Sequence, residues 1–153
     1  MKFNLEIFIT SKLWNTFHKR DDVIPNLKKS LSDLGLEYLD LYLIHWPMGW
    51  DNQGKSDVLR PMDDEGNIIF CDSNFEDTWK EMEKAVELGL VKSIGVSNFN
   101  KKQVQRILDI CKIKPVTNQE KFKIFGLLAH GSKRRSIIDV WTCTAGPVVY
   151  DKL

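Results

Sequence analysis

Apolar residues along the first 119 positions recur in two alternating patterns: short runs without helical spacing, and longer stretches with it. The short runs cover residues 7–10, 39–44, 91–97 and 115–119, and the run at 39–44 is nearly continuous in apolar residues. A strand covered on both faces reads as an almost continuous apolar run. The four runs therefore predict buried strands of a parallel sheet.

A stretch with helical spacing follows the first of these runs. We expect its N-cap at Asp21 or Asp22, Pro25 in its first turn and Gly35 just beyond its end. The apolar residues on its inner side are Val23, Ile24, Leu27, Leu31 and Leu34. Their spacing predicts one helix between the first two strands.

Two more helices are predicted from their capping signals. Asn74 is expected to cap one that ends at Gly89, and Asn100 with Gln103 resembles a capping box at the start of the other. The inner residues are Phe75, Trp79, Met82 and Val86 in the former, and Val104, Ile107, Leu108 and Cys111 in the latter. Residues 48–73, rich in Gly, Asp, Asn and Pro, predict a long surface loop, and loops of that length are usually functional or mobile.

The strand–helix alternation indicates parallel pairing through right-handed crossovers. A doubly wound open sheet and part of a (β/α)8 barrel both fit this order. The first usually carries a glycine-rich loop after its first strand, and residues 11–14 contain no glycine. A complete barrel needs about 250 residues. We therefore expect an α/β fold that is a partial (β/α)8 TIM barrel of about four consecutive units, unclosed.

Composition narrows the class of protein. The chain has 153 residues, 42% hydrophobic, 28% charged and with a net charge of +1, which favours a globular protein without nucleic-acid or membrane partners. Its three cysteines lie far apart and suggest neither a disulfide framework nor a metal site. With no signal peptide or membrane span in the pattern, a cytoplasmic location is expected.

Polar residues stand at the predicted carboxyl ends of the strands, where parallel β/α sheets bind ligands. In sequence order, the residues at the ends of the four strands are Lys12, His45, Ser97 with Asn98, and Gln119. Side chains alternate along a strand, so Lys12 and His45 meet if both face inward, on strands about 4.8 Å apart. Histidine can donate to a carbonyl oxygen, and lysine lowers the pKa of a neighbouring acid.

Three tryptophans, Trp14, Trp46 and Trp50, are candidates to wall an apolar substrate pocket. Each candidate has a plainer interpretation: a solvated lysine, a structural histidine, core tryptophans, and a helix cap at Ser97 and Asn98. The occurrence of polar groups at four consecutive strand ends favours a site.

At this point the residues resemble a family. Residues 7–14 (IFITSKLW), 38–47 (YLDLYLIHWP), 82–99 (ending KSIGVSNF) and 115–119 (PVTNQ) are similar to the aldo-keto reductases, nearest the aldose-reductase-like branch. The resemblance covers roughly residues 5–119, a predicted barrel fragment. Residues 120–153 form a divergent tail of uncertain structure, where 137–143 could be a strand and Lys133 to Arg135 a solvated turn.

The resemblance implies NADP(H)-dependent reduction of aldehydes and ketones to alcohols by hydride transfer. It makes Lys12 and His45 catalytic, assigns Ser97, Asn98 and Gln119 to the nicotinamide carboxamide, and places Trp14, Trp46 and Trp50 at the substrate. The implied partner is a small carbonyl compound.

The family also uses a tyrosine proton donor and an aspartate on the strand before Lys12, and this sequence does not include that strand. The last two strands of the family's barrel carry the lysine- and arginine-containing segment that holds the adenosine phosphate. This sequence does not include them either. We therefore expect the chain alone to be impaired or inactive. The alternative function is a non-catalytic truncated or spliced fragment that binds cofactor weakly or associates with other chains through exposed barrel edges.

Overall fold

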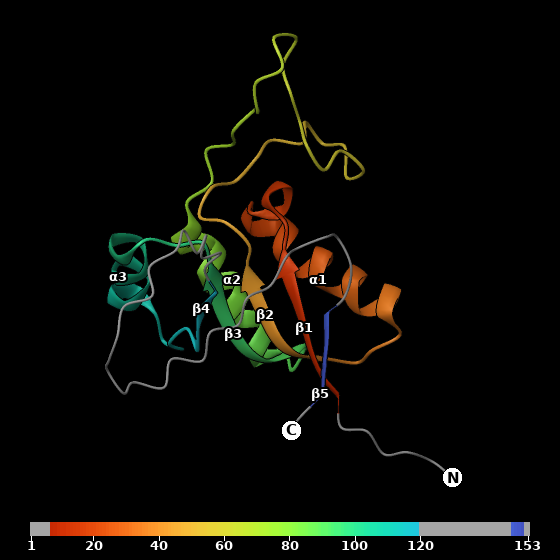
Figure 1. Ribbon diagram of the computed structural model, residues 1–153, viewed down its shortest axis with the longest axis vertical. Helices are drawn as coiled ribbons and strands as arrows, with labels where there is room; N and C mark the ends of the chain where they lie inside the picture. Colours follow the sequence, from red (N-terminus) through yellow and green to blue (C-terminus); the bar gives the residue numbers. More distant parts are fainter. Residues whose placement is uncertain (1–6, 120–147, 152–153) are drawn as a thin grey trace, which may run out of the picture.

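A computed structural model of the chain describes residues 7–119 and, for the backbone alone, residues 148–151. In these ranges one sheet has the strand order β4-β3-β2-β1-β5. The strands are β1 (Ile7–Leu13), β2 (Leu39–Ile44), β3 (Val91–Ser97), β4 (Asn118–Gln119) and β5 (Val148–Asp151). The first four are parallel, and each lies beside the preceding strand in the sequence (Figure 1).

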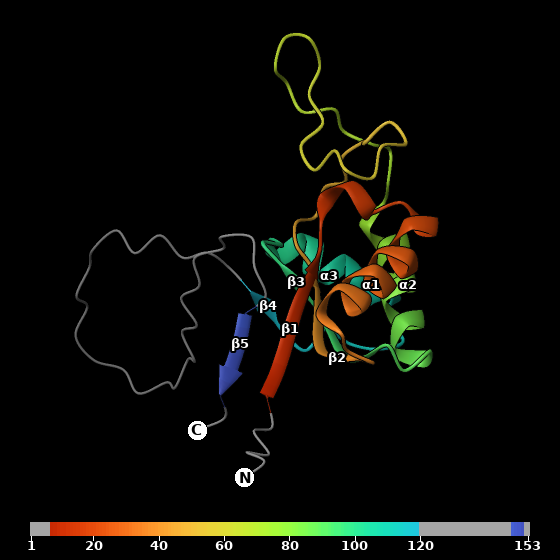
Figure 2. The same ribbon diagram turned by 90° about the vertical axis from the view of Figure 1, so that its right-hand side faces the viewer.

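Three helices connect the parallel strands, and all three cover the same face of the sheet (Figure 2). They are α1 (Arg20–Leu34), α2 (Phe75–Glu87) and α3 (Lys101–Ile110), and a 3-10 turn, η1 (Asn15–Phe17), precedes α1. A doubly wound sheet reverses its strand order and has helices on both faces. Sequential order with helices on one face therefore identifies a partial, open barrel and excludes the doubly wound alternative.

The core lies between the sheet and these helices. Alternate strand residues face it, and they are Leu13, Tyr42, Ile44, Ile94 and Val96, each fully buried. The predicted helix residues pack against them, with Val23, Leu27, Trp79, Met82 and Ile107 completely enclosed. Leu108 is the exception, since it is 40% exposed. Ile107 is the one buried residue of α3, so only a narrow stripe of this helix is enclosed.

The predicted helix ends are confirmed except at the start of α1. Asn74 accepts from the Glu76 N–H, and Asn100 and Gln103 form a complete capping box. Gly35 ends α1 with φ 66°, a left-handed conformation that favours glycine.

At the start of α1 the predictions are wrong. The N-cap is Lys19, which makes no side-chain capping bond. Asp21 and Asp22 lie inside the first turn, where they complement the helix dipole without capping it. Pro25 lies in the helix interior, beyond the first turn, so one backbone hydrogen bond of α1 is lost there.

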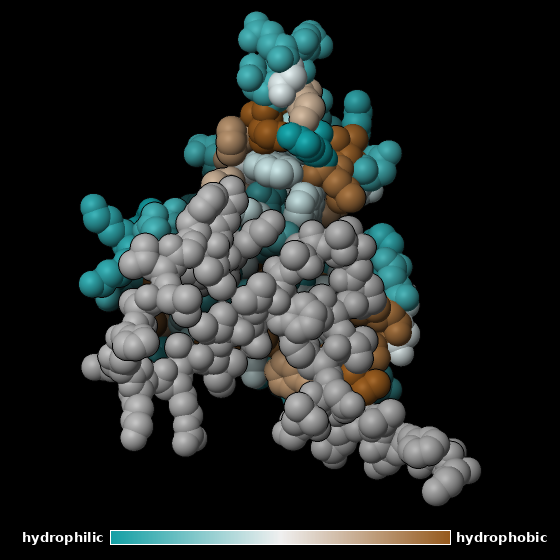
Figure 3. Space-filling view, in the orientation of Figure 1, coloured by the Kyte–Doolittle hydropathy of each residue, from teal (hydrophilic) through white to brown (hydrophobic). Residues whose placement is uncertain are grey.

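Residues 48–73 form the predicted loop, which stands away from the body above the carboxyl ends of β1 and β2 (Figure 1). Two isolated antiparallel bridges, Trp50 to Phe70 and Met62 to Ile68, join its two arms. Exposed apolar side chains gather on it (Figure 3), among them Leu59, Met62 and Phe70. None of the described helices is both long and apolar enough to cross a bilayer.

The strand β5 was not predicted, and it pairs antiparallel with β1 from Ile7 opposite Asp151 to Thr10 opposite Val148. The expectation of a free edge at β1 is therefore wrong over these residues. Pairing between the two ends of a chain leaves no local sequence signal. The strand predicted at 137–143 and the basic turn Lys133 to Arg135 lie outside the described residues.

Candidate active site

The pairing of β1 with β2 places Lys12 and His45 at one end of one face. Lys12 lies opposite Leu43, and Leu13 lies opposite Ile44. The His45 N–H then donates to the Leu13 carbonyl at 3.2 Å, which holds His45 beside the end of β1. Because Leu13 and Ile44 point toward the helices, Lys12 and His45 both point to the opposite, inner face.

The charge of Lys12 acts on His45. Burial, followed by the nearby Lys12 ammonium, lowers the pKa of His45 from 6.5 to about 4. Both effects disfavour the imidazolium. At neutral pH His45 is therefore a neutral imidazole, with one nitrogen that donates and one that accepts.

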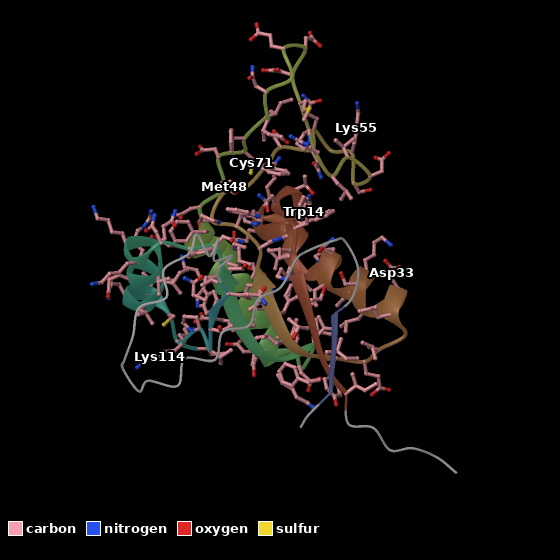
Figure 4. The ribbon with its side chains drawn as sticks, viewed as in Figure 1. Trp14, Asp33, Met48, Lys55, Cys71 and Lys114 are labelled. Carbon is pink, nitrogen blue, oxygen red and sulfur yellow. The ribbon has the colours of Figure 1, made fainter. Side chains whose placement is uncertain are left out.

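The tryptophans gather around this histidine, where the loop joins the body near the labelled Trp14 and Met48 (Figure 4). The Trp14 ring meets the His45 ring edge-on, with centroids 5.0 Å apart, and the Trp46 ring stacks with the His45 ring at a centroid distance of 6.3 Å. Trp50 packs edge-on against Trp14 at 5.6 Å. The Trp14 Nε1–H donates to the Leu59 carbonyl at 2.7 Å, so the loop orients the indole. These rings form an apolar wall beside one polar imidazole.

Ser97, Asn98 and Gln119 also lie together, at the ends of β3 and β4. The Ser97 hydroxyl donates to the Gln119 carbonyl at 2.8 Å, and the Asn98 N–H donates to the same oxygen at 3.0 Å. The Asn98 Nδ2 donates to the His45 carbonyl at 2.9 Å and to Ser97 Oγ at 3.0 Å. Asn98 has φ 61°, a left-handed conformation that asparagine tolerates better than most residues. Asn98 therefore joins three consecutive strand ends through its side-chain amide and its backbone N–H.

This arrangement fits a carboxamide ligand. The bonds above use both Nδ2 donors of Asn98 but not its Oδ1, and only the backbone oxygen of Gln119, not its side chain. An amide acceptor and a complete glutamine amide at adjacent strand ends match the donors and acceptor of a nicotinamide carboxamide. The described residues can thus hold that end of a dinucleotide cofactor.

Sequence reasoning missed three buried polar residues next to this site. Asn15, Thr16 and His18, in and after η1, are at most 2% exposed, and none of their side-chain N or O atoms has a hydrogen-bond partner. Burial, followed by His45, lowers the pKa of His18 to about 4. The only available signal was the three-residue spacing of Asn15 and His18, which in a 3-10 turn puts side chains on one side.

Comparison with known proteins gives consistent matches. The model of the aldo/keto reductase family matches residues 1–141. An aldo-keto reductase family 1 member A1-A from Danio rerio is 56% identical over 114 residues, covering 74% of this chain and 34% of the relative. The corresponding member A1 from Gallus gallus is 41% identical over 146 residues, covering 93% and 44%.

Solved structures agree with these relatives. The aldose reductase from Schistosoma japonicum superposes with a TM-score of 0.71 at 52% identity, over 75% of this chain and 37% of that one. The chain thus spans between about a third and less than half of the proteins it matches. The family match continues past residue 119, and the division of the chain at that position stays a prediction.

Proposed function

Because the chain belongs to the aldo/keto reductase family, we propose that its strand ends form part of a site for NADP(H)-dependent reduction of aldehydes and ketones to alcohols. The observation that carries the proposal is a neutral His45 beside Lys12, walled by Trp14 and Trp46. A neutral N–H donor in an apolar wall suits a carbonyl oxygen that gains negative charge as it is reduced.

Each residue has a distinct role in this proposal. His45 donates a hydrogen bond to the carbonyl oxygen and orients the carbonyl group. Burial and, after it, Lys12 keep His45 neutral, and Lys12 favours negative charge at a neighbouring acid. Ser97, Asn98 and Gln119 hold the carboxamide, which fixes the nicotinamide ring relative to the carbonyl. When bound, the reduced cofactor supplies the hydride.

Neither tyrosine of residues 7–119 is placed to give the proton. Tyr42 points toward the helices and is fully buried, and burial raises the pKa of its hydroxyl further from neutrality. Tyr38 lies before β2, at the end of the sheet away from His45. The Lys92 Nζ lies over its ring, 4.0 Å from the ring centroid. A positioned general acid contributes about 10²–10⁴-fold to a rate. We therefore propose that residues 7–119 orient substrate and cofactor and, without a tyrosine donor of their own, reduce aldehydes at least about 100-fold more slowly than a relative that has one.

The test measures cofactor binding separately from turnover. NADPH binding to the 153-residue chain is followed by quenching of tryptophan fluorescence, and aldehyde reduction by loss of NADPH absorbance. Replacing Gln119→Ala or Ser97→Ala is expected to weaken binding about 3–10-fold, the effect of one lost hydrogen bond. Gln105→Ala, on the solvent side of α3, is the matched control. Equal dissociation constants for all three variants would refute the proposed carboxamide site.

The second candidate function is association with other chains. It is favoured by the edge beyond β3, where β4 has only two residues and Leu108, Ile110 and Val116 are between 39% and 61% exposed. An exposed apolar sheet edge can pair with another chain. Sedimentation at several concentrations tests this: a dimer that Val116→Lys dissociates supports it, and a monomer at all concentrations contradicts it.

A further inference from the structure

Asn15 and His18 form a buried polar pair that the proposed function leaves unused. Asn15 is 0% exposed and His18 is 1% exposed. Both amide atoms of Asn15 and both ring nitrogens of His18 lack a hydrogen-bond partner. Three residues apart on a 3-10 turn, the two side chains lie on the same side of η1.

The pair is held in place from three directions. The Asn15 carbonyl accepts from the Trp50 N–H at 2.9 Å, and the His18 carbonyl accepts from the Thr78 hydroxyl at 2.8 Å. Gly49 lies so close that a Cβ on it would meet the His18 Cβ at 3.1 Å. Contacts from the loop and from α2 therefore hold the backbone of this turn in place.

Buried polar atoms are almost always hydrogen-bonded, to protein or to an ordered water molecule. Four such atoms on one side of one turn need a hydrogen-bond partner that can both donate and accept. Water is the smallest molecule that does so. The turn lies near the active histidine, since Trp14, the residue before Asn15, contacts the His45 ring. In agreement, the pKa of His18 is lowered first by burial and then by the protonated form of His45.

The ring of His45 also requires a hydrogen-bond partner. The described contacts of its ring are with Trp14 and Trp46, which offer no hydrogen bond to a ring nitrogen in these arrangements. A neutral imidazole exists as two tautomers, and the partner of one nitrogen decides whether the other carries the proton. For His45 to donate toward a carbonyl, its second nitrogen must accept from something behind it.

We propose that His18, together with Asn15, is a positioning residue for His45, acting through an ordered water that donates to the rear nitrogen of His45. The water in turn accepts from the N–H of His18 and from the amide N–H of Asn15, so the loss of either donor disturbs it. This fixes the tautomer in which the front nitrogen of His45 donates to substrate. The inference deepens the proposed function and rests on it for the role of the front nitrogen.

Nitrogen-15 NMR of the full chain with labelled histidines tests it without substrate or cofactor. At neutral pH the His45 ring nitrogens, assigned with a His45→Gln variant, are expected to show one predominant tautomer. In His18→Leu the tautomer ratio should change about fivefold, the ratio that one ordinary hydrogen bond sustains. His18→Gln keeps a donor and an acceptor and should restore most of the original ratio.

Phe17→Leu, an apolar change in the same turn, is the matched control and should leave the ratio as it was. An unchanged His45 ratio in a folded His18→Leu chain would overturn the proposal. If His18→Leu does not fold, Asn15→Leu takes its place, and the same two outcomes decide. The result is separable from the proposed function, because a failure of cofactor binding would leave the tautomer measurement intact.

Discussion

Glu83 is expected to be a main stabilising contact between α2 and the segment that leads to β4. Its side chain is buried, and its Oε1 accepts from the backbone N–H groups of Lys112 and Ile113 at 2.6 and 2.8 Å. Both donors lie just beyond the end of α3. The carboxylate thus satisfies two backbone groups and fixes the approach of the chain to Gln119.

The size of the effect follows from these two bonds. A hydrogen bond to a charged group contributes about 1.5–3 kcal/mol, so two give about 3–6 kcal/mol. The donors are only partly buried and regain some water, so we expect Glu83→Ala to lower the free energy of unfolding by about 3 kcal/mol. Glu83→Gln keeps the acceptor and loses the charge, and it should cost about half as much.

The assay is urea denaturation at equilibrium, combined with amide hydrogen exchange. Glu83→Ala should shift the midpoint with an unchanged slope and speed exchange at Lys112 and Ile113 more than in the core of β2. Glu87→Ala, an exposed glutamate of the same helix, is the control. If the free energy of unfolding of Glu83→Ala is within about 0.5 kcal/mol of that of this control, the two bonds do not stabilise the fold as argued.

Three further predictions concern the site and its supports. The pKa of His18 is about 4 when folded and 6.5 when unfolded, so the unfolded chain binds the extra proton and stability falls as pH drops from 6.5 toward 4. Between pH 7 and about pH 5, wild type should lose about 2 kcal/mol more than His18→Leu in denaturant titrations, and parallel curves would contradict this. Asn98→Ala should be about 1 kcal/mol less stable than Asn98→Gly, because both lose the amide but only alanine is strained at φ 61°; equal midpoints would show no strain. Gly95→Ala should destabilise by about 2 kcal/mol, since its Cβ would lie 2.8 Å from Leu43 Cδ2 and from the Thr117 carbonyl, and an unchanged thermal midpoint would show that β4 moves away freely.

Local patterns predicted most of the fold. The runs at residues 39–44 and 91–97 correspond to β2 and β3 over their full length, and the capping signals at Asn74 and Asn100 are confirmed. These signals succeed because a strand period, a cap or a left-handed glycine depends on residues within a few positions of each other. The alternation along β1 and β2 was enough to predict that Lys12 and His45 share a face.

Predictions failed where a residue's role depends on distant parts of the chain. The charges of Asp21 and Asp22 indicated a cap, but the path of the chain out of η1 put the helix start at Lys19. Leu108 fits the apolar spacing, yet it lies outside the narrow enclosed stripe at Ile107 and stays 40% exposed. The pairing of β5 with β1 joins opposite ends of the sequence.

The sequence by itself determined the β/α order, the parallel pairing and the identity of the polar residues at the strand ends. Only the tertiary structure decided which groups surround His45: two tryptophan rings, the Lys12 charge and the buried turn with His18. The physical reason is the sequence distance over which each property is determined. Backbone conformation follows from neighbours in sequence, whereas burial, electrostatic coupling and the pKa of an imidazole follow from neighbours in space.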